Sequence, residues 1–287
     1  MSAAASDGNR RRANVADGGP TRLVGVVNIT PDSFSDGGRF LSVEHAVEHA
    51  LALDAAGAAA LDLGAESTRP GYEPVPAKTQ LERLLPVLAA LRPHTDCALS
   101  IDTTRADVAV AALRAGADWI NDTTAFTDDP AMAKVVAEHD CPAILMHRFE
   151  PPRRSGDARE PHSVADQVAE TLRRRVDHAV QQGVRPERLL LDPGIGFGTL
   201  PADNAVLCAE VEPLRALGRP LVYGPSRKSF LGHLTGRPVD ERVAATAACV
   251  AALTLAGVDF IRVHDVAEML DVVTVAQAIR EGRREHV

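Results

Sequence analysis

The sequence predicts one α/β domain folded as a (β/α)8 barrel, the TIM barrel, behind a short leader. Short apolar runs alternate eight times with longer segments of helical periodicity, and glycines stand where several of those segments end. The length of 287 residues also suits this fold, because barrels of about 250 residues commonly form a single domain.

Eight short apolar runs are the predicted strands. Parallel strands that are covered on both faces read as runs of aliphatic residues rather than as a strict alternation. The runs occupy residues 23–28, 59–63, 98–102, 119–122, 143–147, 189–192, 221–223 and 260–263.

Segments with helical periodicity follow these runs, at residues 43–56, 78–91, 105–115, 130–138, 164–182, 202–217, 241–256 and 266–281. Five of them are followed by a glycine that can end a helix in the left-handed conformation, namely Gly57, Gly116, Gly183, Gly218 and Gly257. Eight strands joined by right-handed crossovers can close into a barrel. An open doubly wound sheet more often has about five or six strands and a glycine-rich dinucleotide turn.

The barrel domain is predicted to span residues 21–287, and residues 1–20 are predicted to be a disordered, solvated leader. The leader is rich in Ala, Ser and Gly and carries three consecutive arginines at 10–12. Residues 148–162 are rich in Pro, Arg, Asp and Glu and lack apolar periodicity, which predicts a long mobile loop after the fifth strand.

Composition narrows the classes of partner and location. Lys plus Arg number 31 against 39 Asp plus Glu, and the net charge of −8 disfavours binding to nucleic acid or to an anionic membrane. No apolar run reaches the roughly 20 residues that span a bilayer, and the first residues lack an apolar signal segment, so a cytoplasmic location is predicted. The four cysteines are widely spaced, which predicts neither a zinc site nor a disulfide framework.

Polar side chains follow nearly every predicted strand. In a barrel of this kind the active site lies at the carboxyl ends of the strands. Asp102 or Asp122 alone could equally cap the following helix. Several buried carboxylates and amides converging on one pocket would be costly without a ligand, so the set favours a polar heterocycle such as an aminopyrimidinone. The strand-end groups include Asn28, Glu66, Asp102, Asn121, Asp122, His147, Asp192, Lys228, Arg262 and His264.

Two basic stretches are typical of an anion site. One is Ser-Thr-Arg-Pro-Gly at 67–71, and the other is Ser-Arg-Lys at 226–228, which opens a helical segment. Arg262 and His264 follow the eighth strand nearby, and a pyrophosphate would fit between the two stretches. Arg227 alone could equally be a surface ion-pair partner.

Eight motifs, in order from about Val24 to Val266, resemble those of the dihydropteroate synthase family. They are NITPDSFSDGG at 28–38, ESTRPG at 66–71, SIDT at 100–103, IND at 120–122, LMH at 145–147, DPGIGFG at 192–198, SRKSF at 226–230 and RVHDV at 262–266. The resemblance implies a pterin-binding barrel, which agrees with the strand count. It also implies a transferase of folate biosynthesis that forms a C–N bond. The reaction condenses 7,8-dihydropterin-6-ylmethyl pyrophosphate with p-aminobenzoate, giving dihydropteroate and pyrophosphate.

The resemblance also implies roles for individual residues. The pterin ring would lie against four polar side chains and two packing ones: Asp102, Asn121, Asp192, Lys228, Met146 and Arg262. The pyrophosphate would be held by Asn28, Thr68, Arg69, Arg262 and His264, with Mg2+ bridging Asn28 and phosphate oxygens. p-Aminobenzoate would lie near Pro70, Phe197, Ser226 and Lys228. The catalytic groups implied are Asp36, Lys228 and Arg262, with Asp36 stabilising developing positive charge, and a homodimer is the implied assembly.

The chain departs from the family's usual pattern near the substrate region. Thr199 stands where a Lys is common, residues 123–126 (Thr-Thr-Ala-Phe) replace an aliphatic-Ser-Gly segment, and Phe126 could narrow the pocket. These departures suggest a divergent synthase with altered handling of p-aminobenzoate or sulfonamides. Two alternatives are a non-catalytic pterin-binding paralogue and a methyltransferase that passes a methyl group from methyltetrahydrofolate to a corrinoid protein. The second would not need the Ser-Arg-Lys motif or the Asn28 loop.

Overall fold

The computed structural model describes residues 15, 19–29, 39–66, 75–154 and 163–284. Eight parallel strands form one sheet in the order β6-β5-β4-β3-β2-β1-β8-β7. Between β6 and β7 the sheet closes through a single bridge from Leu191 to Leu221, and the Leu191 amide donates to the Pro220 carbonyl at 2.9 Å. The predicted (β/α)8 barrel is therefore confirmed. Most of the predicted leader, and residues 155–162 of the predicted mobile loop, lie outside the described residues.

Each strand lies within one residue, at either end, of its predicted position. The strands are β1 (Arg22–Asn28), β2 (Ala60–Gly64), β3 (Ala98–Asp102), β4 (Trp119–Asp122), β5 (Ala143–Met146), β6 (Leu189–Asp192), β7 (Val222–Tyr223) and β8 (Phe260–Val263). Apolar runs locate these strands well because both faces of the sheet are covered.

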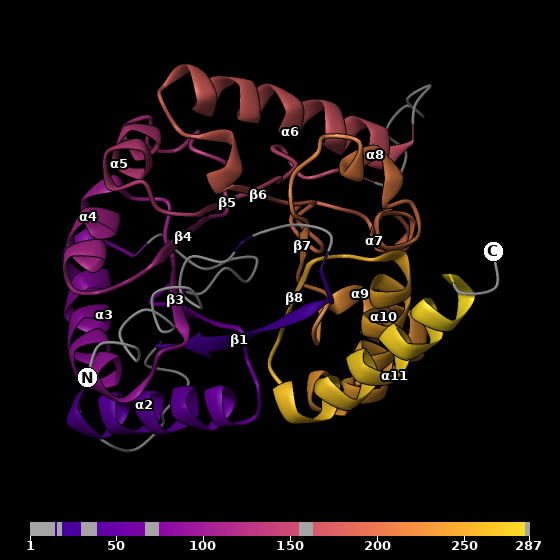
Figure 1. Cartoon of the computed structure of the whole chain (residues 1–287), viewed down its shortest axis with the longest axis horizontal. Helices are drawn as coiled ribbons and strands as arrows, with labels where there is room; N and C mark the ends of the chain where they lie inside the picture. Colours follow the sequence, from indigo (N-terminus) through magenta and orange to yellow (C-terminus); the bar gives the residue numbers. More distant parts are fainter. Residues whose placement is uncertain (1–14, 16–18, 30–38, 67–74, 155–162, 285–287) are drawn as a thin grey trace.

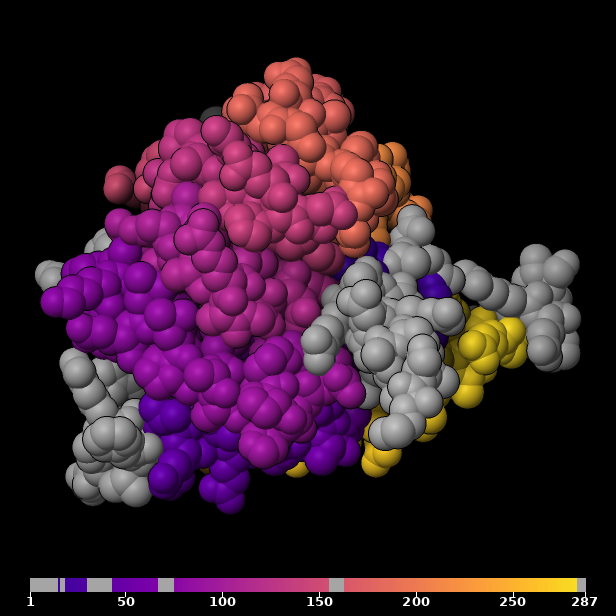
Figure 2. Space-filling model, turned by 60° about the vertical axis from the view of Figure 1, so that its left-hand side comes forward, coloured from indigo at the N-terminus to yellow at the C-terminus, as the bar shows by residue number. Residues whose placement is uncertain are grey.

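Helices surround the sheet as a ring (Figure 1), and the colours in Figure 2 grade smoothly across the surface because successive helices lie side by side. They are α2 (Arg39–Ala55), α3 (Ala77–Leu91), α4 (Ala106–Arg114), α5 (Ala131–His139), α6 (Val164–Gln181), α7 (Pro201–Ala209), α8 (Glu212–Arg215), α9 (Ser229–Thr235), α10 (Val243–Ala256) and α11 (Val266–Arg284). Short 3-10 turns occupy Arg92–His94, Pro186–Arg188 and Val239–Glu241. Within the described ranges, none of the helices combines the length and the apolar character needed to cross a bilayer.

One predicted helix, over residues 202–217, is wrong, because two helices stand in its place. α7 ends at Ala209, and α8 begins at Glu212 with Pro213 in its first turn. A proline has no amide hydrogen and clashes with the carbonyl four residues earlier, so it cannot continue α7. The five glycines predicted to end helices do take positive φ, as Gly257 shows at the end of α10 with φ of 78°.

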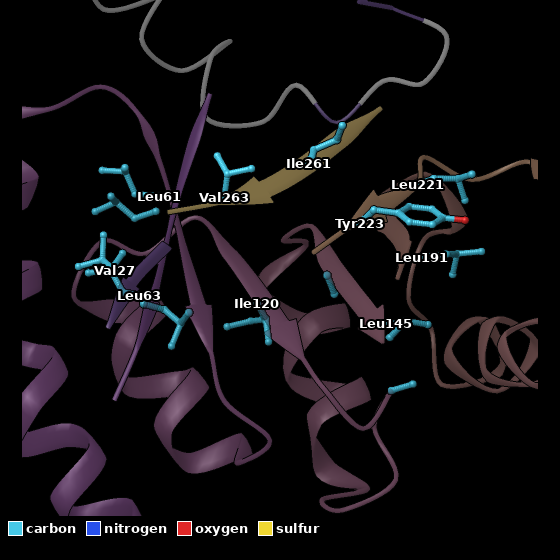
Figure 3. Packing of buried hydrophobic residues seen from close by; sticks show 14 of the residues in the cluster. Val27, Leu61, Leu63, Ile120, Leu145, Leu191, Leu221, Tyr223, Ile261 and Val263 are labelled. Atoms are coloured by element: carbon cyan, nitrogen blue, oxygen red, sulfur yellow. The ribbon is translucent and has the colours of Figure 1, made fainter. Parts of the chain in front are cut away.

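The outer face of the sheet packs against the helices in one large apolar cluster. Alternate side chains along a strand point to the same face. Val27, Leu61, Leu63, Ile261 and Val263 represent this face in Figure 3, and each is at most 1% exposed. Aliphatic packing therefore dominates the core, as the 3% aromatic content predicts.

A second, smaller cluster fills the barrel interior at the amino ends of the strands. Each of the eight strands contributes one side chain to it, and Val15, 5% exposed, joins them. Trp119 and Phe260 meet edge to face with ring centroids 5.5 Å apart, beside the small Ala60 and Ala98. This apolar plug fills one end of the barrel, so a ligand would reach the interior from the carboxyl ends of the strands.

We expect Trp119→Ala to lower the free energy of unfolding by about 3 to 5 kcal/mol, because it leaves a cavity in the barrel interior. Denaturant unfolding followed by circular dichroism measures the loss. Val180→Ala, at a side chain on α6 that is 39% exposed, is the control and should change stability by less than about 0.5 kcal/mol. Equal effects of the two substitutions would contradict the assignment of Trp119 to a packed interior.

Candidate active site

The inward-facing positions that follow the apolar plug are mostly polar. Because side chains alternate, the residue two positions after each plug residue also faces the interior. Asp62, Asn121 and Asp192 occupy such positions and are at most 2% exposed. The set comprises Val26 on β1, Asp62 on β2, Ser100 on β3, Asn121 on β4, Met146 on β5, Asp192 on β6 and Arg262 on β8. The interior thus changes from apolar to charged toward the mouth of the barrel.

Asp62 joins two of these side chains. Arg262 Nη2 forms an ion pair with Asp62 Oδ2 and lies 3.4 Å from Asp102 Oδ2. Asn121 Nδ2 donates to the same Asp62 Oδ2 at 3.0 Å. Side chains from four strands therefore meet at the mouth. Arg262 Nε, Asn121 Oδ1 and Asp62 Oδ1 are buried and find no hydrogen-bond partner among the described residues, which suits a site that is completed by a ligand.

Lys228 reaches the same mouth from the segment that follows β7. Its Nζ lies 4.2 Å from the centre of the Phe197 ring, an arrangement that attracts the ammonium to the ring face. Its charge also interacts with those of Arg262, Asp192 and Asp102. The four groups predicted to surround one flat ring, Asp102, Asn121, Asp192 and Lys228, therefore gather at one end of the barrel.

The backbone around Lys228 is held from two sides. Arg227 takes a positive φ of 57° and forms a bidentate ion pair with Asp265, in which Nε donates to Oδ2 at 3.0 Å and Nη2 donates to Oδ1. Its amide donates to Thr246 Oγ1 at 3.1 Å, and Arg242 Nη1 donates to the Arg227 carbonyl at 3.0 Å. Of the two roles predicted for Arg227, part of an anion site or an ion-pair partner, the structure shows the ion pair, which holds the loop before Lys228.

The loop after β6 fixes Asp192 and Phe197. The Gly194 amide donates to Asp192 Oδ1 at 2.8 Å. Gly194 has φ of 76°, and a Cβ there would lie 1.8 Å from the His147 carbonyl oxygen, so only glycine fits. The Phe149 amide donates to the Phe197 carbonyl at 3.2 Å, which ties the loops after β5 and β6 together.

Ser226 and His264 form a polar pair beside Lys228. The His264 amide donates to Ser226 Oγ at 3.2 Å, and Ser226 Oγ lies 2.9 Å from His264 Nδ1. Burial, with help from the Arg227 charge, lowers the pKa of His264 to about 4. The ring is therefore neutral near pH 7. When Ser226 donates to Nδ1, the ring proton stands on Nε2, where it can be offered to an anion.

Burial also shifts the pKa of the charged groups at the mouth. It raises the pKa of Asp102 to about 7, with Asp62 adding to the effect and Arg262 opposing it. It raises the pKa of Asp192 to about 6, again against Arg262. It lowers the pKa of Lys228 to about 8. A ligand that offers N–H groups to the two carboxylates would favour their ionised forms.

Several predicted site residues can be placed individually. Met146 faces inward on β5 and is 1% exposed. Asn28 ends β1 with its side chain exposed. Asp36, Thr68, Arg69 and Pro70 lie outside the described residues.

Asn28 offers an amide oxygen of the kind that Mg2+ accepts. In the described part of the chain, no group of three or more His, Cys, Asp or Glu could hold a metal ion. Asn28 is therefore the residue, among those predicted for the metal, that the structure describes.

The departures from the family pattern have structural roles. Asp122 accepts from the amide of Thr124 at 2.8 Å and from that of Phe126 at 3.2 Å, so it holds a turn. Phe126 is 1% exposed and packs in the outer apolar cluster, away from the interior. Thr199 Oγ1 accepts from the Gly196 amide at 3.1 Å and braces the loop that carries Phe197.

Sequence reasoning missed Asp62. It lies within the apolar run predicted as the strand over residues 59–63, and a lone carboxylate within such a run is itself a signal. The position alternates inward, and in the sheet register Asp62 stands between Val26 on β1 and Ser100 on β3.

Comparisons with known proteins show the family to which this chain belongs. A family model described as "Pterin binding enzyme" matches residues 24–264. A dihydropteroate synthase from Synechocystis is 42% identical over 260 residues, which cover 90% of each chain. The chain belongs to the dihydropteroate synthase family of pterin-binding enzymes.

Solved structures of dihydropteroate synthases share the fold. The enzyme from Xanthomonas albilineans with 4-aminobenzoic acid has a TM-score of 0.84 and 43% identity, covering 91% of this chain and 93% of that one. The same enzyme in complex with 7,8-dihydropteroate has a TM-score of 0.82 and 40% identity, covering 91% and 94%.

We expect Asp102→Asn to stabilise the free protein above neutral pH. The folded pKa of Asp102, about 7, exceeds the ordinary value of 3.8. Its stabilising contribution is therefore full below about pH 4 and is lost as pH rises through 7. Urea unfolding at pH 4.5 and at pH 8 measures the effect. The difference in free energy of unfolding between the variant and the native chain should rise by at least about 1 kcal/mol from the lower pH to the higher one.

Asp107→Asn, which removes an exposed carboxylate from α4, is the matched control for the loss of one negative charge. If Asp102→Asn and the native chain showed the same pH dependence of unfolding, Asp102 would not be the strained carboxyl described above.

Proposed function

We infer that this chain condenses 7,8-dihydropterin-6-ylmethyl pyrophosphate with p-aminobenzoate, giving dihydropteroate and pyrophosphate. The observation that carries the inference is the gathering of Asp102, Asn121, Asp192 and Lys228 at one mouth of the barrel, in a chain of this family. Relatives with 4-aminobenzoic acid and with 7,8-dihydropteroate support the same pair of ligands.

The polar groups at the mouth complement the edge of a pterin ring. The ring's amino group and ring N–H need acceptors, which carboxylates and an amide oxygen supply, and its carbonyl needs a donor such as an ammonium. Asp102 and Asp192 are the acceptors, and Lys228 is the donor. Met146, buried beside them on β5, packs against the ring.

The pyrophosphate lies toward Arg262, His264 and Ser226. As the C–O bond breaks, its electron pair leaves with the pyrophosphate oxygen, and Arg262 stabilises the growing negative charge. The pterin methyl carbon becomes a resonance-stabilised cation, the p-aminobenzoate nitrogen attacks it, and that nitrogen loses a proton. Phe197 beside Lys228 offers an apolar face for the p-aminobenzoate ring.

Asn28 would hold a Mg2+ ion, which would supply further neutralisation of the leaving group's charge. Asp36, Thr68, Arg69 and Pro70, which lie outside the described residues, keep their proposed roles at the cation, the pyrophosphate and p-aminobenzoate. Altered handling of p-aminobenzoate or sulfonamides also stays a prediction. Phe126 does not narrow the interior, so it does not support that prediction. Thr199 braces the loop that carries Phe197, the residue proposed to contact p-aminobenzoate.

We expect purified protein to release pyrophosphate and form dihydropteroate only when both substrates are present. Lys228→Ala should lower kcat/KM by at least about 100-fold, because a buried group that binds the reacting ring is lost. Lys134→Ala, at an exposed side chain on α5, is the control and should keep full activity. Binding of the pterin without turnover would favour the non-catalytic paralogue. Methyl transfer from methyltetrahydrofolate would favour the methyltransferase.

We also propose a homodimer, in the cytoplasm, formed through the helices α9 to α11. Among the described residues, five of the six large apolar side chains that are exposed lie in this region: Leu234, Val239, Leu270, Val275 and Ile279. α10 is apolar around its whole circumference, with Ala244, Ala248 and Ala252 exposed. Helices of this kind are normally covered, and a second copy of the chain supplies a matching apolar face.

We expect Ile279→Asp to shift the chain toward monomer in analytical ultracentrifugation, because it places a charge in the proposed interface. Val180→Asp, at the sixth exposed apolar side chain, lies on α6 and should leave the assembly unchanged. A native chain that sediments as a monomer at all concentrations would end this proposal and leave the enzymatic one intact.

A further inference from the structure

The amide of Asn121 has only one orientation compatible with its neighbour. Its Nδ2 lies 3.0 Å from Asp62 Oδ2, and Arg262 Nη2 is paired with the same oxygen. An ionised carboxylate can only accept hydrogen bonds, so Asn121 must turn its NH2 group toward Asp62. Its carbonyl oxygen Oδ1 then faces the other way, buried and without a partner among the described residues.

Asp62 also determines how Arg262 is presented. Its Nη2 contacts both Asp62 and Asp102, so the guanidinium lies across the mouth. Its Nε is buried and has no hydrogen-bond partner in the described part of the chain. Asp62 itself is 1% exposed, and among the described residues its carboxylate is contacted by the donors Arg262 and Asn121.

We propose that Asp62 is a positioning residue that sets the hydrogen-bonding pattern of the pterin site. Its carboxylate holds Asn121 as an acceptor and Arg262 as a donor toward the ligand. The proposal rests on the proposed function, because it assumes that the ring in the mouth is a pterin. An amide held this way accepts from a ring N–H and rejects a ring that offers a carbonyl at the same point, so Asp62 contributes to specificity through Asn121.

Loss of the Asp62 charge has a second consequence that a purely structural role would not have. Asp102 is faced by Asp62 from β2, Asp122 from β4, Arg262 from β8 and Lys228 from the segment after β7. Asp62 raises the pKa of Asp102, after burial as the larger cause. In Asp62→Asn that repulsion is absent and Arg262 is freed to pair with Asp102, so both changes move the ionisation of Asp102 to lower pH.

The test is steady-state kinetics on Asp62→Asn, Asn121→Ala and the double variant. Asp62→Asn should raise KM for the pterin pyrophosphate at least tenfold and leave KM for p-aminobenzoate within twofold. The fold-loss of kcat/KM for the pterin pyrophosphate in the double variant should be at least threefold smaller than the product of the fold-losses in the two single variants, because Asp62 acts partly through Asn121. The acid limb of kcat/KM should move to lower pH by at least about half a unit.

Asp118→Asn is the matched control. Asp118 Oδ2 also pairs with an arginine, Arg92 at 2.8 Å, and accepts an amide hydrogen bond, but it lies at the amino end of β4. It should leave both KM values and the pH profile unchanged. Equal KM changes for the two substrates, additive losses or an unmoved pH profile would each overturn the positioning role. A native chain without turnover would instead overturn the proposed function.

If Asp62→Asn does not fold, neutron diffraction on the native chain decides the matter. The proposal expects the two amide deuterons of Asn121 on the side of Asp62. Deuterons on the side of the mouth, with the carbonyl toward Asp62, would overturn it.

Discussion

The interior of a closed eight-stranded barrel is only wide enough for side chains, and this constraint governs the rest of the molecule. Every second residue of every strand must point inward and find its partners there. In this chain the first inward positions are apolar and pack around Trp119 and Phe260. The next are mostly polar and include two acids, an amide and an arginine, which lie toward the mouth. The same alternation that builds a stable plug therefore also builds a polar pocket above it.

Charge within that pocket is costly in the free protein. Asp62, Asp102 and Asp192 are buried with two cations, Arg262 and Lys228, so the acids are not fully balanced. Buried ion pairs seldom repay the full desolvation of both partners. A polar ring that donates to the acids supplies the missing interactions, which links the strain of the free site to its affinity for the ligand.

The sequence predicted most of the fold, because buried parallel strands are marked by apolar runs and helix ends by glycines such as Gly257. The helix predicted over residues 202–217 is two helices, α7 and α8, because Pro213 cannot continue α7. In the site, Asp192 and Lys228 were found because they stand at strand ends beside glycine-rich or basic motifs.

Asp62 was missed for the opposite reason, since it stands inside a strand among aliphatic residues. Only the closure of the barrel brings it to Arg262, which is 200 residues away along the chain and on a neighbouring part of the ring. The role of Asp122 likewise depended on the turn that follows β4, because the same side chain could have faced a ligand or held a loop. Pairings of this kind follow from the register of the strands, which the apolar pattern alone does not give.

The central claim is that one flat ring is recognised inside the mouth of the barrel. A crystal structure of the chain with a bound pterin measures this directly. The account predicts that the edge of the ring lies within hydrogen-bonding distance of Asp102, Asn121, Asp192 and Lys228, above the apolar plug. A pterin bound elsewhere on the molecule, with these four side chains unengaged, would contradict it.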